Sequence, residues 1–155
     1  MSSSQRFVHL RVHSEYSLSD SIVRLDALVN RVHELGMPAV ALTDLANVFG
    51  AVKFFRQAVG RGIKPIIGAD VWLLNPTDVN KPHRLLLLCQ GTDGYRRLCR
   101  LLTRAHQEGQ HTGRPCIDRA WLADGTDDLL ALSGAQDGDI GQALLGDNTA
   151  QADRL

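Results

Sequence analysis

Three short stretches of this sequence carry side chains that could do chemistry, and the first begins at His9. His9, Arg11 and His13 alternate along an apolar segment with the pattern of a strand, so their side chains would share one face. Asp20 follows in a polar loop, close enough in sequence to fold back toward His13. Histidines two apart with a nearby carboxylate could begin a metal site. They could also be surface residues of a strand and its loop, and spacing alone favours this second interpretation.

The second and third stretches each contain a carboxylate beside a predicted strand. Thr43, Asp44 and Asn47 follow one strand, where any of them could simply cap the next helix. Asp70 interrupts another, otherwise apolar strand. A buried carboxylate is costly unless it is paired or bound to a metal, so we expect Asp70 to have a specific partner.

The elements that must position these residues alternate between short apolar runs and amphipathic stretches. The apolar runs predict strands at 7–12, 38–42, 64–74, 85–88 and 129–132. Helical spacing predicts helices at 25–35, 48–59 and 95–106, with shorter ones at 117–122 and 140–145.

The nearly continuous apolar strands are typical of strands covered on both faces, as in a parallel sheet or a barrel of βα units. In that α/β architecture, polar residues at the carboxyl ends of strands carry the chemistry. Those positions are held by His13, Asp44, Asp70 and Ser133.

The composition disfavours two classes of protein, direct DNA-binding modules and membrane proteins. Seventeen basic and seventeen acidic residues cancel, and aromatic residues make up 5%. This disfavours a direct DNA-binding module, which needs cationic stripes or stacking platforms. Three scattered cysteines (Cys89, Cys99 and Cys116) without CxxC spacing indicate reduced thiols, two of them in the core. No apolar run approaches the roughly 20 residues needed to span a bilayer, so we expect a cytoplasmic protein without a membrane partner.

Several motifs together resemble the PHP (polymerase and histidinol phosphatase) domain with which the alpha subunits of bacterial DNA polymerase III begin. The resemblance is carried, in order and over most of the chain, by FVHLRVHSEYSL (7–18), GMPAVALTD (36–44), NVFGAVKFF (47–55), GIKPIIG (62–68) and Gly94-Tyr95. It implies a distorted (βα)7 barrel. Residues 1–155 would be the N-terminal portion of one truncated PHP domain and supply roughly its first half.

The resemblance also implies a metal site, of which part is kept. Active family members hold metal ions with His, Asp and Glu side chains and hydrolyse phosphoesters. Three remnant ligand positions are held here by His13, Asp20 and Asp70, the last standing where the family has a glutamate.

Other ligand positions are degenerate. Arg11 replaces the first histidine of a His-x-His motif, and Leu45 replaces the histidine of Thr-Asp-His. A further histidine aligns with Arg84, although a one-residue insertion would instead place His83 there. Leucine cannot ligate a metal, and an always-charged arginine repels a divalent cation.

The replaced residues suggest what could fill the place of the metal. Our hypothesis is that Arg11 occupies this space and pairs with Asp20 or Asp70 through charge-assisted hydrogen bonds. The alternative is that Arg11 points to solvent.

By resemblance, the chain is the first segment of the polymerase that copies the chromosome, and it contains no catalytic residue itself. It would be an inactive scaffold that docks the proofreading exonuclease and other replicase subunits, with DNA reached through the parent polymerase. No cofactor is expected in this segment, whereas the parent polymerase would use Mg. The alternative is a live metal-dependent phosphoesterase or 3'–5' exonuclease site, which would hold Zn or Mn.

Overall fold

The structure is a computed structural model that describes residues 7–123 and 125–155. The chain forms two compact units, one ending at Ala69 and the other beginning at Asp70. Strand β2 (Lys64–Leu73) crosses this boundary, so its first residues belong to one unit and its last residues to the other. Among the helices that the described residues form, none has the length and apolar character needed to cross a bilayer.

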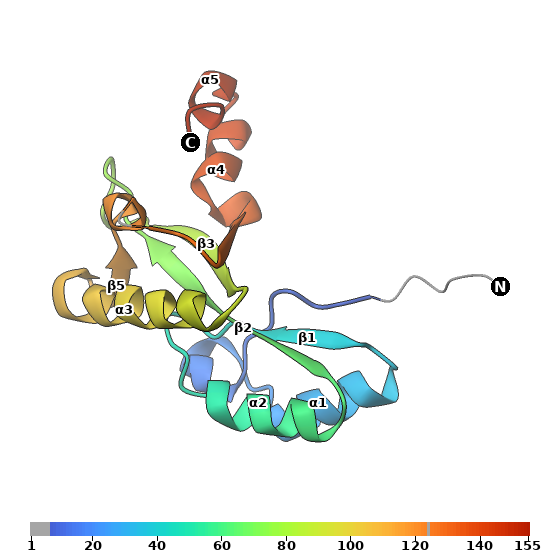
Figure 1. Ribbon diagram of the computed structural model, residues 1–155. Helices are drawn as coiled ribbons and strands as arrows, with labels where there is room; N and C mark the ends of the chain where they lie inside the picture. Colours follow the sequence, from blue (N-terminus) through green and yellow to red (C-terminus); the bar gives the residue numbers. More distant parts are fainter. Residues whose placement is uncertain (1–6, 124) are drawn as a thin grey trace. The chain divides into compact units, whose positions relative to one another are not determined.

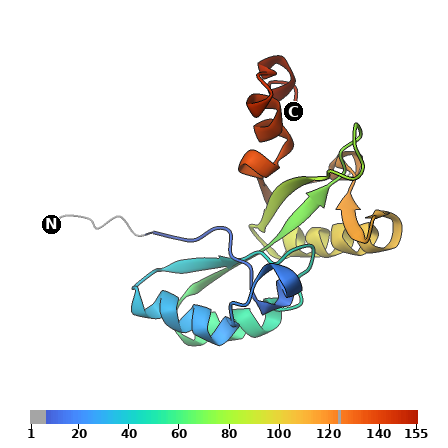
Figure 2. The same ribbon diagram turned by 180° about the vertical axis from the view of Figure 1, so that it is seen from behind.

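The first unit is a pair of parallel strands covered by two helices. Its other elements are the 3-10 helix η1 (Glu15–Asp20), α1 (Leu25–Glu34), β1 (Ala39–Leu42) and α2 (Ala51–Gly60). In the parallel register, Ala39 of β1 lies opposite Lys64 of β2, and Leu42 lies opposite Ile67. Helices α1 and α2 lie side by side along the same face of these strands in both views (Figures 1 and 2).

The core of this unit follows from the apolar spacing of its helices. Helix α1 buries residues three and four apart and is followed by Gly36, whose φ of 65° is the left-handed conformation that commonly ends a helix. The buried cluster comprises Leu25, Val29, Val32, Val40, Leu42, Phe54, Ala58 and Ile63.

The second unit is a mixed sheet with α3 packed against it. Its remaining elements are β3 (His83–Cys89), α3 (Thr92–Glu108), β4 (Gln110–His111), β5 (Arg114–Ile117), η2 (Arg119–Leu122), β6 (Leu129–Ser133), η3 (Ala135–Asp137), α4 (Asp139–Leu145) and α5 (Thr149–Ala152). The strand order is β4-β5-β2-β3-β6. Strand β5 is parallel to the end of β2, whereas the β3–β6 and β4–β5 pairs are antiparallel. Helix α3 packs on β3 and β5 (Figure 1).

The predicted α/β class is confirmed, with corrections in detail. The strand predicted at 7–12 is wrong: this segment forms an isolated bridge between His9 and Val40. Its backbone accepts one hydrogen bond from β1 (Ala41) and one from Thr43 just after it, which is too few for a regular ladder. The expectation that the strands are covered on both faces is confirmed for β1. It is wrong for β6, an edge strand whose Leu130 and Leu132 are exposed. Of the cysteines, Cys116 is buried and the other two are half-buried. The seven-unit barrel and the truncation stay predictions.

Candidate functional site

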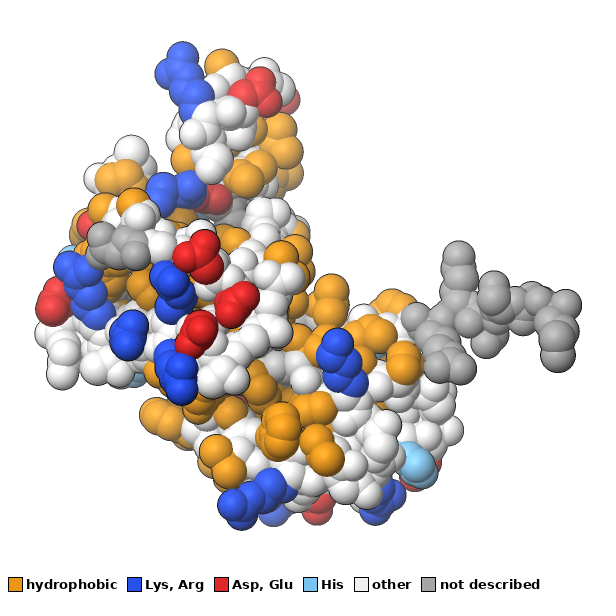
Figure 3. Space-filling model, viewed as in Figure 1, with side chains coloured by type: hydrophobic (Ala, Val, Ile, Leu, Met, Phe, Trp, Pro, Cys, Tyr) orange, Lys and Arg blue, Asp and Glu red, His pale blue; other side chains and the backbone are white. Residues whose placement is uncertain are grey.

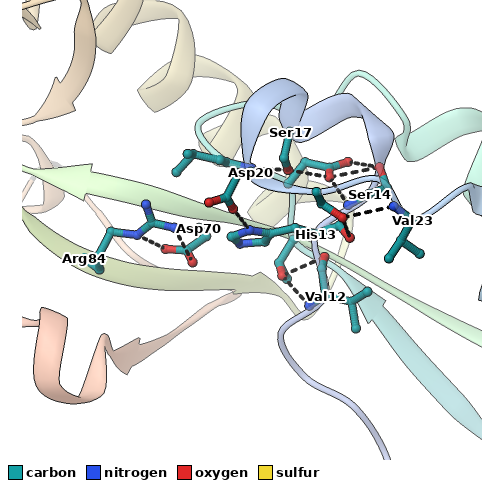
Figure 4. Close-up of polar contacts among 12 residues, drawn as sticks. Val12, His13, Ser14, Ser17, Asp20, Val23, Asp70 and Arg84 are labelled. Atoms are coloured by element: carbon teal, nitrogen blue, oxygen red, sulfur yellow. Dashed lines mark hydrogen bonds and ion pairs between the residues drawn. The ribbon is translucent and has the colours of Figure 1, made fainter.

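Asp70 is a buried carboxylate held by a guanidinium from the neighbouring strand. It lies in β2 with 1% of its surface exposed, and Arg84 reaches it from the start of β3. Arg84 Nε donates to Asp70 Oδ1 at 3.0 Å, and Nη2 donates to Oδ2 at 2.9 Å (Figure 4). This two-point fork is the strongest arrangement of an arginine and a carboxylate. It confirms that Asp70 has a specific partner.

Trp72 further fixes the Arg84 side chain. Residues 70 and 72 lie on the same face of β2, because alternate side chains of a strand point the same way. The Arg84 Cζ atom lies 4.3 Å from the centroid of the Trp72 ring, and that of Arg114 lies 5.1 Å from it. Cation–π contacts at these distances are favourable, so Arg84 is held by both a carboxylate and a ring.

The His83 side chain does not lie on the face of the sheet that carries Asp70. It precedes Arg84 in β3, so its side chain points to the opposite face of the strand. There it lines a cavity of about 610 Å³ together with Arg119 and Asp139. Burial, with a smaller contribution from the Arg119 charge, lowers the pKa of His83 below 6.5. The structure therefore places Arg84, and not His83, on Asp70.

Asp44 is the second buried carboxylate, and neutral donors surround it. Its side chain is 1% exposed. Its Oδ1 accepts from the Ser14 backbone N–H at 2.6 Å and from the Ser17 hydroxyl at 2.7 Å. The Ser14 hydroxyl lies 2.9 Å from both carboxylate oxygens of Asp44. The carboxylate thus ties the loop at the start of η1 to the end of β1.

The helix-capping interpretation of this stretch is wrong. Helix α2 begins at Ala51, and its N-cap, Gly50, makes no side-chain cap hydrogen bond. Thr43 Oγ1 instead accepts from the Val12 N–H at 2.9 Å, and Asn47 Nδ2 donates to the Tyr16 carbonyl at 3.0 Å. Thr43 and Asn47 therefore bond to backbone groups of Val12 and Tyr16 and do not cap a helix.

His13 and Asp20 come together as predicted. The 3-10 helix η1 brings Asp20 Oδ2 onto His13 Nδ1, in a contact within one unit (Figure 4). Leu45 is half-buried, and its N–H donates to Ser17 Oγ at 3.0 Å. Arg11 is an exposed residue, and its pairing with Asp20 or Asp70 stays a prediction.

Comparison of the sequence with known proteins shows the family to which the chain belongs. The sequence pattern of the PHP domain family matches residues 9–155, nearly the whole chain. The chain belongs to the PHP domain family. It is 46% identical over 149 residues to the DNA polymerase III subunit alpha of Pseudomonas fluorescens and 47% identical over 149 residues to that of Pseudomonas aeruginosa. Each match covers 96% of this chain but spans only 13% of the relative.

A solved structure shares the fold. It is described as a candidate metal-dependent phosphoesterase from Bifidobacterium adolescentis, and it matches with a TM-score of 0.52 at 16% identity. The match covers 66% of this chain and 34% of that protein. At this identity the likeness shows the PHP-type fold alone.

The donor set of this PHP chain does not fit the metal cluster of active members. Asp70 offers its oxygens to a fixed positive charge, Arg84, and the side chain of Leu45 has no donor atom. Among the residues that the structure describes, no three His, Cys, Asp or Glu side chains gather in a way that could hold a metal ion.

Sequence reasoning missed four residues that shape these carboxylate sites: Ser14, Ser17, Trp72 and Arg114. Two signals could have found some of them. Serines three apart beside a candidate ligand can both donate to one carboxylate, and Trp72 lies two residues after Asp70 on the same face of a strand. No sequence spacing indicates Arg114, whose approach depends on the pairing of β5 with β2.

Proposed function

We propose that this chain is the PHP segment of a DNA polymerase III alpha subunit, and that within the segment no catalysis takes place. The polymerase assignment rests on the 46% and 47% identity to proteins of that name over nearly the whole chain. Template-directed DNA synthesis would then belong to the parent protein, whose catalytic residues lie outside this chain.

The observation that carries the inactive role is the fork of Arg84 on Asp70. A metal ligand must offer its lone pairs to the cation, but both oxygens of Asp70 accept hydrogen bonds from a guanidinium that cannot deprotonate. The guanidinium supplies a fixed positive charge where active relatives use a metal. The charge stabilises the fold around Asp70 but provides no activated water.

In this role the segment is a rigid support that docks the proofreading exonuclease subunit and other subunits of the replicase. A support of this kind needs an intact PHP fold and not an intact metal cluster. The buried Asp44 and Asp70 networks, both held by hydrogen bonds, provide that rigidity.

The test is metal content and hydrolysis, measured on the full-length protein purified without chelator and then incubated with zinc or manganese. We expect strongly substoichiometric metal and no cleavage of a generic phosphoester. Stoichiometric metal that is lost in Asp70→Ala, but kept in the exposed-carboxylate control Asp26→Ala, would instead establish a live phosphoesterase or 3'–5' exonuclease site. The retained contact between His13 and Asp20 is the observation that favours this second candidate.

A further inference from the structure

Helix α2 presents an apolar stripe to solvent. Val52, Phe55 and Val59 are spaced three and four apart, so they lie on one face of the helix, and Phe49 precedes it. Their exposed fractions are 60%, 51% and 53%, and that of Phe49 is 73%. Figure 3 shows hydrophobic side chains gathered over this helix. Single exposed apolar residues are ordinary, but a continuous stripe is typical of a binding surface.

The stripe is more exposed than the core requires. The opposite face of α2 already buries Ala51, Phe54 and Ala58 against α1 and the strands, and this suffices to anchor the helix. The large apolar side chains on the remaining face leave half or more of their surface in solvent, so the packing of this unit uses them only in part. A partner that covers them would bury the rest of this apolar surface.

The polar residues that α2 itself and the turn after it place beside the stripe are all cationic or neutral. Helix α2 and the turn after it contain Lys53, Arg56 and Arg61 and no acidic residue. Lys53 lies 3.7 Å from Glu15, whereas Arg56 and Arg61 form no ion pair with any residue that the structure describes. The stripe therefore has a positive border that an acidic partner would complement.

We propose that this surface, defined by Phe49, Val52, Phe55, Val59 and the cations Arg56 and Arg61, docks an acidic amphipathic helix of a partner protein. The apolar face of such a helix would cover the stripe, and its carboxylates would meet the two arginines. The proposal rests on the docking role given above and locates it on α2. A second copy of this chain fits less well, because a two-fold contact of α2 with α2 would bring like charges together.

The experiment measures binding of the full-length polymerase to the purified proofreading exonuclease subunit, by calorimetry at two salt concentrations. Val52→Asp and Phe55→Asp should each weaken binding at least about tenfold, as expected for residues at the centre of an interface. Arg56→Glu should weaken it severalfold and reduce its salt dependence, because exposed charge pairs are screened by salt. The matched controls are Leu145→Asp on α4, which replaces an exposed leucine outside this surface, and Arg31→Glu on α1.

A second measurement follows alkylation of a Val52→Cys variant by mass spectrometry. The proposal expects rapid labelling of the free polymerase and protection in the complex. Protection in the free polymerase would mean that its own chain covers α2 and would overturn the proposal. A complex that forms normally with the Asp variants, or leaves Cys at position 52 reactive, would overturn the location on α2 but keep the docking role. If the wild-type proteins form no complex, the docking role and its location both fail.

Discussion

Arg84 and Asp70 form a two-point fork between neighbouring strands, with donor–acceptor distances of 3.0 and 2.9 Å. Asp70 is fully buried, and the Arg84 side chain is 10% exposed. The sequence predicted that Arg11 pairs with Asp20 or Asp70, and that pairing stays a prediction; the fork shows that Arg84 is a partner of Asp70. The adjacent strand supplies Arg84 because β3 is the sheet neighbour of β2.

The fork predicts a large stability loss when only one partner is removed. Arg84→Gln should lower the free energy of unfolding by about 3–5 kcal/mol, because a buried carboxylate loses the cation that holds it. Urea unfolding followed by circular dichroism measures this change. Adding Asp70→Asn to Arg84→Gln should recover part of the loss, since no buried charge then remains at position 70.

A surface pair gives the matched control for the fork. Arg96→Gln removes the exposed partner of Asp93, a pair at 2.8 Å, and should cost less than about 1 kcal/mol. Equal losses for the buried and the exposed variants would contradict the structural role of the fork.

The Asp44 network predicts that the carboxylate stabilises the loop before α1. In Asp44→Ala, the Ser14 N–H and the hydroxyls of Ser14 and Ser17 lose a buried acceptor, so we expect destabilisation of about 3 kcal/mol or more. Asp44→Asn should be milder, because its side-chain oxygen still accepts. Thermal unfolding of both variants, with the exposed Asp26→Ala as control, tests this order. An Asn variant that is no more stable than the Ala variant would mean that the charge and the second acceptor oxygen, and not one acceptor oxygen alone, hold this loop.

Much of the fold could be predicted because its elements have clear apolar periodicity. The spacing in α1, β1 and β3 predicts these elements within one or two residues. The β4–β5 hairpin was missed, because its strands have only two and four residues, too few to show an alternating pattern. Its turn, Thr112-Gly113, has positive φ at both residues, 50° and 76°, which is the geometry of a tight hairpin turn.

The candidate site was less predictable than the fold, for a physical reason. Sequence spacing places His13 near Asp20, since a single polar loop connects them. It cannot say which arginine reaches Asp70, because that depends on strand order and on the stacking of Arg84 over Trp72. Contacts between distant segments follow from the completed sheet, which local periodicity does not encode.

The lowered pKa of His83 predicts that the protein loses stability as the pH falls below about 6.5. Burial, and then the Arg119 charge, lower its pKa in the folded protein below 6.5, so the unfolded chain takes up a proton at higher pH. Stability should therefore be unaffected above about pH 6.5 and fall as the pH drops from there through the lowered value. His83→Gln should show a shallower decline over this range. An NMR titration should find the pKa of His83 below 6.5.

The same titration separates the two causes of the His83 shift. Arg119→Gln removes the charge but leaves the burial, so the pKa of His83 should rise only part of the way toward 6.5. A full return to 6.5 would show that the arginine, and not desolvation, is the larger cause.

The position of Gly94 near the start of α3 leaves no room for a side chain. A Cβ atom added at this residue would lie 2.1 Å from the Asp128 carbonyl oxygen, a backbone atom that cannot rotate away. That carbonyl also accepts the Gln90 N–H at 2.8 Å, which fixes its position. Gly94→Ala should therefore destabilise the protein by about 1–3 kcal/mol, the usual cost of overpacking. Gly60→Ala, in α2, has no atom within 4 Å of the added Cβ and should raise stability by up to about 1 kcal/mol through helix propensity. Urea unfolding of the two variants should thus show changes of opposite sign, and a loss in both would mean that the close approach of α3 to Asp128 is not what requires glycine.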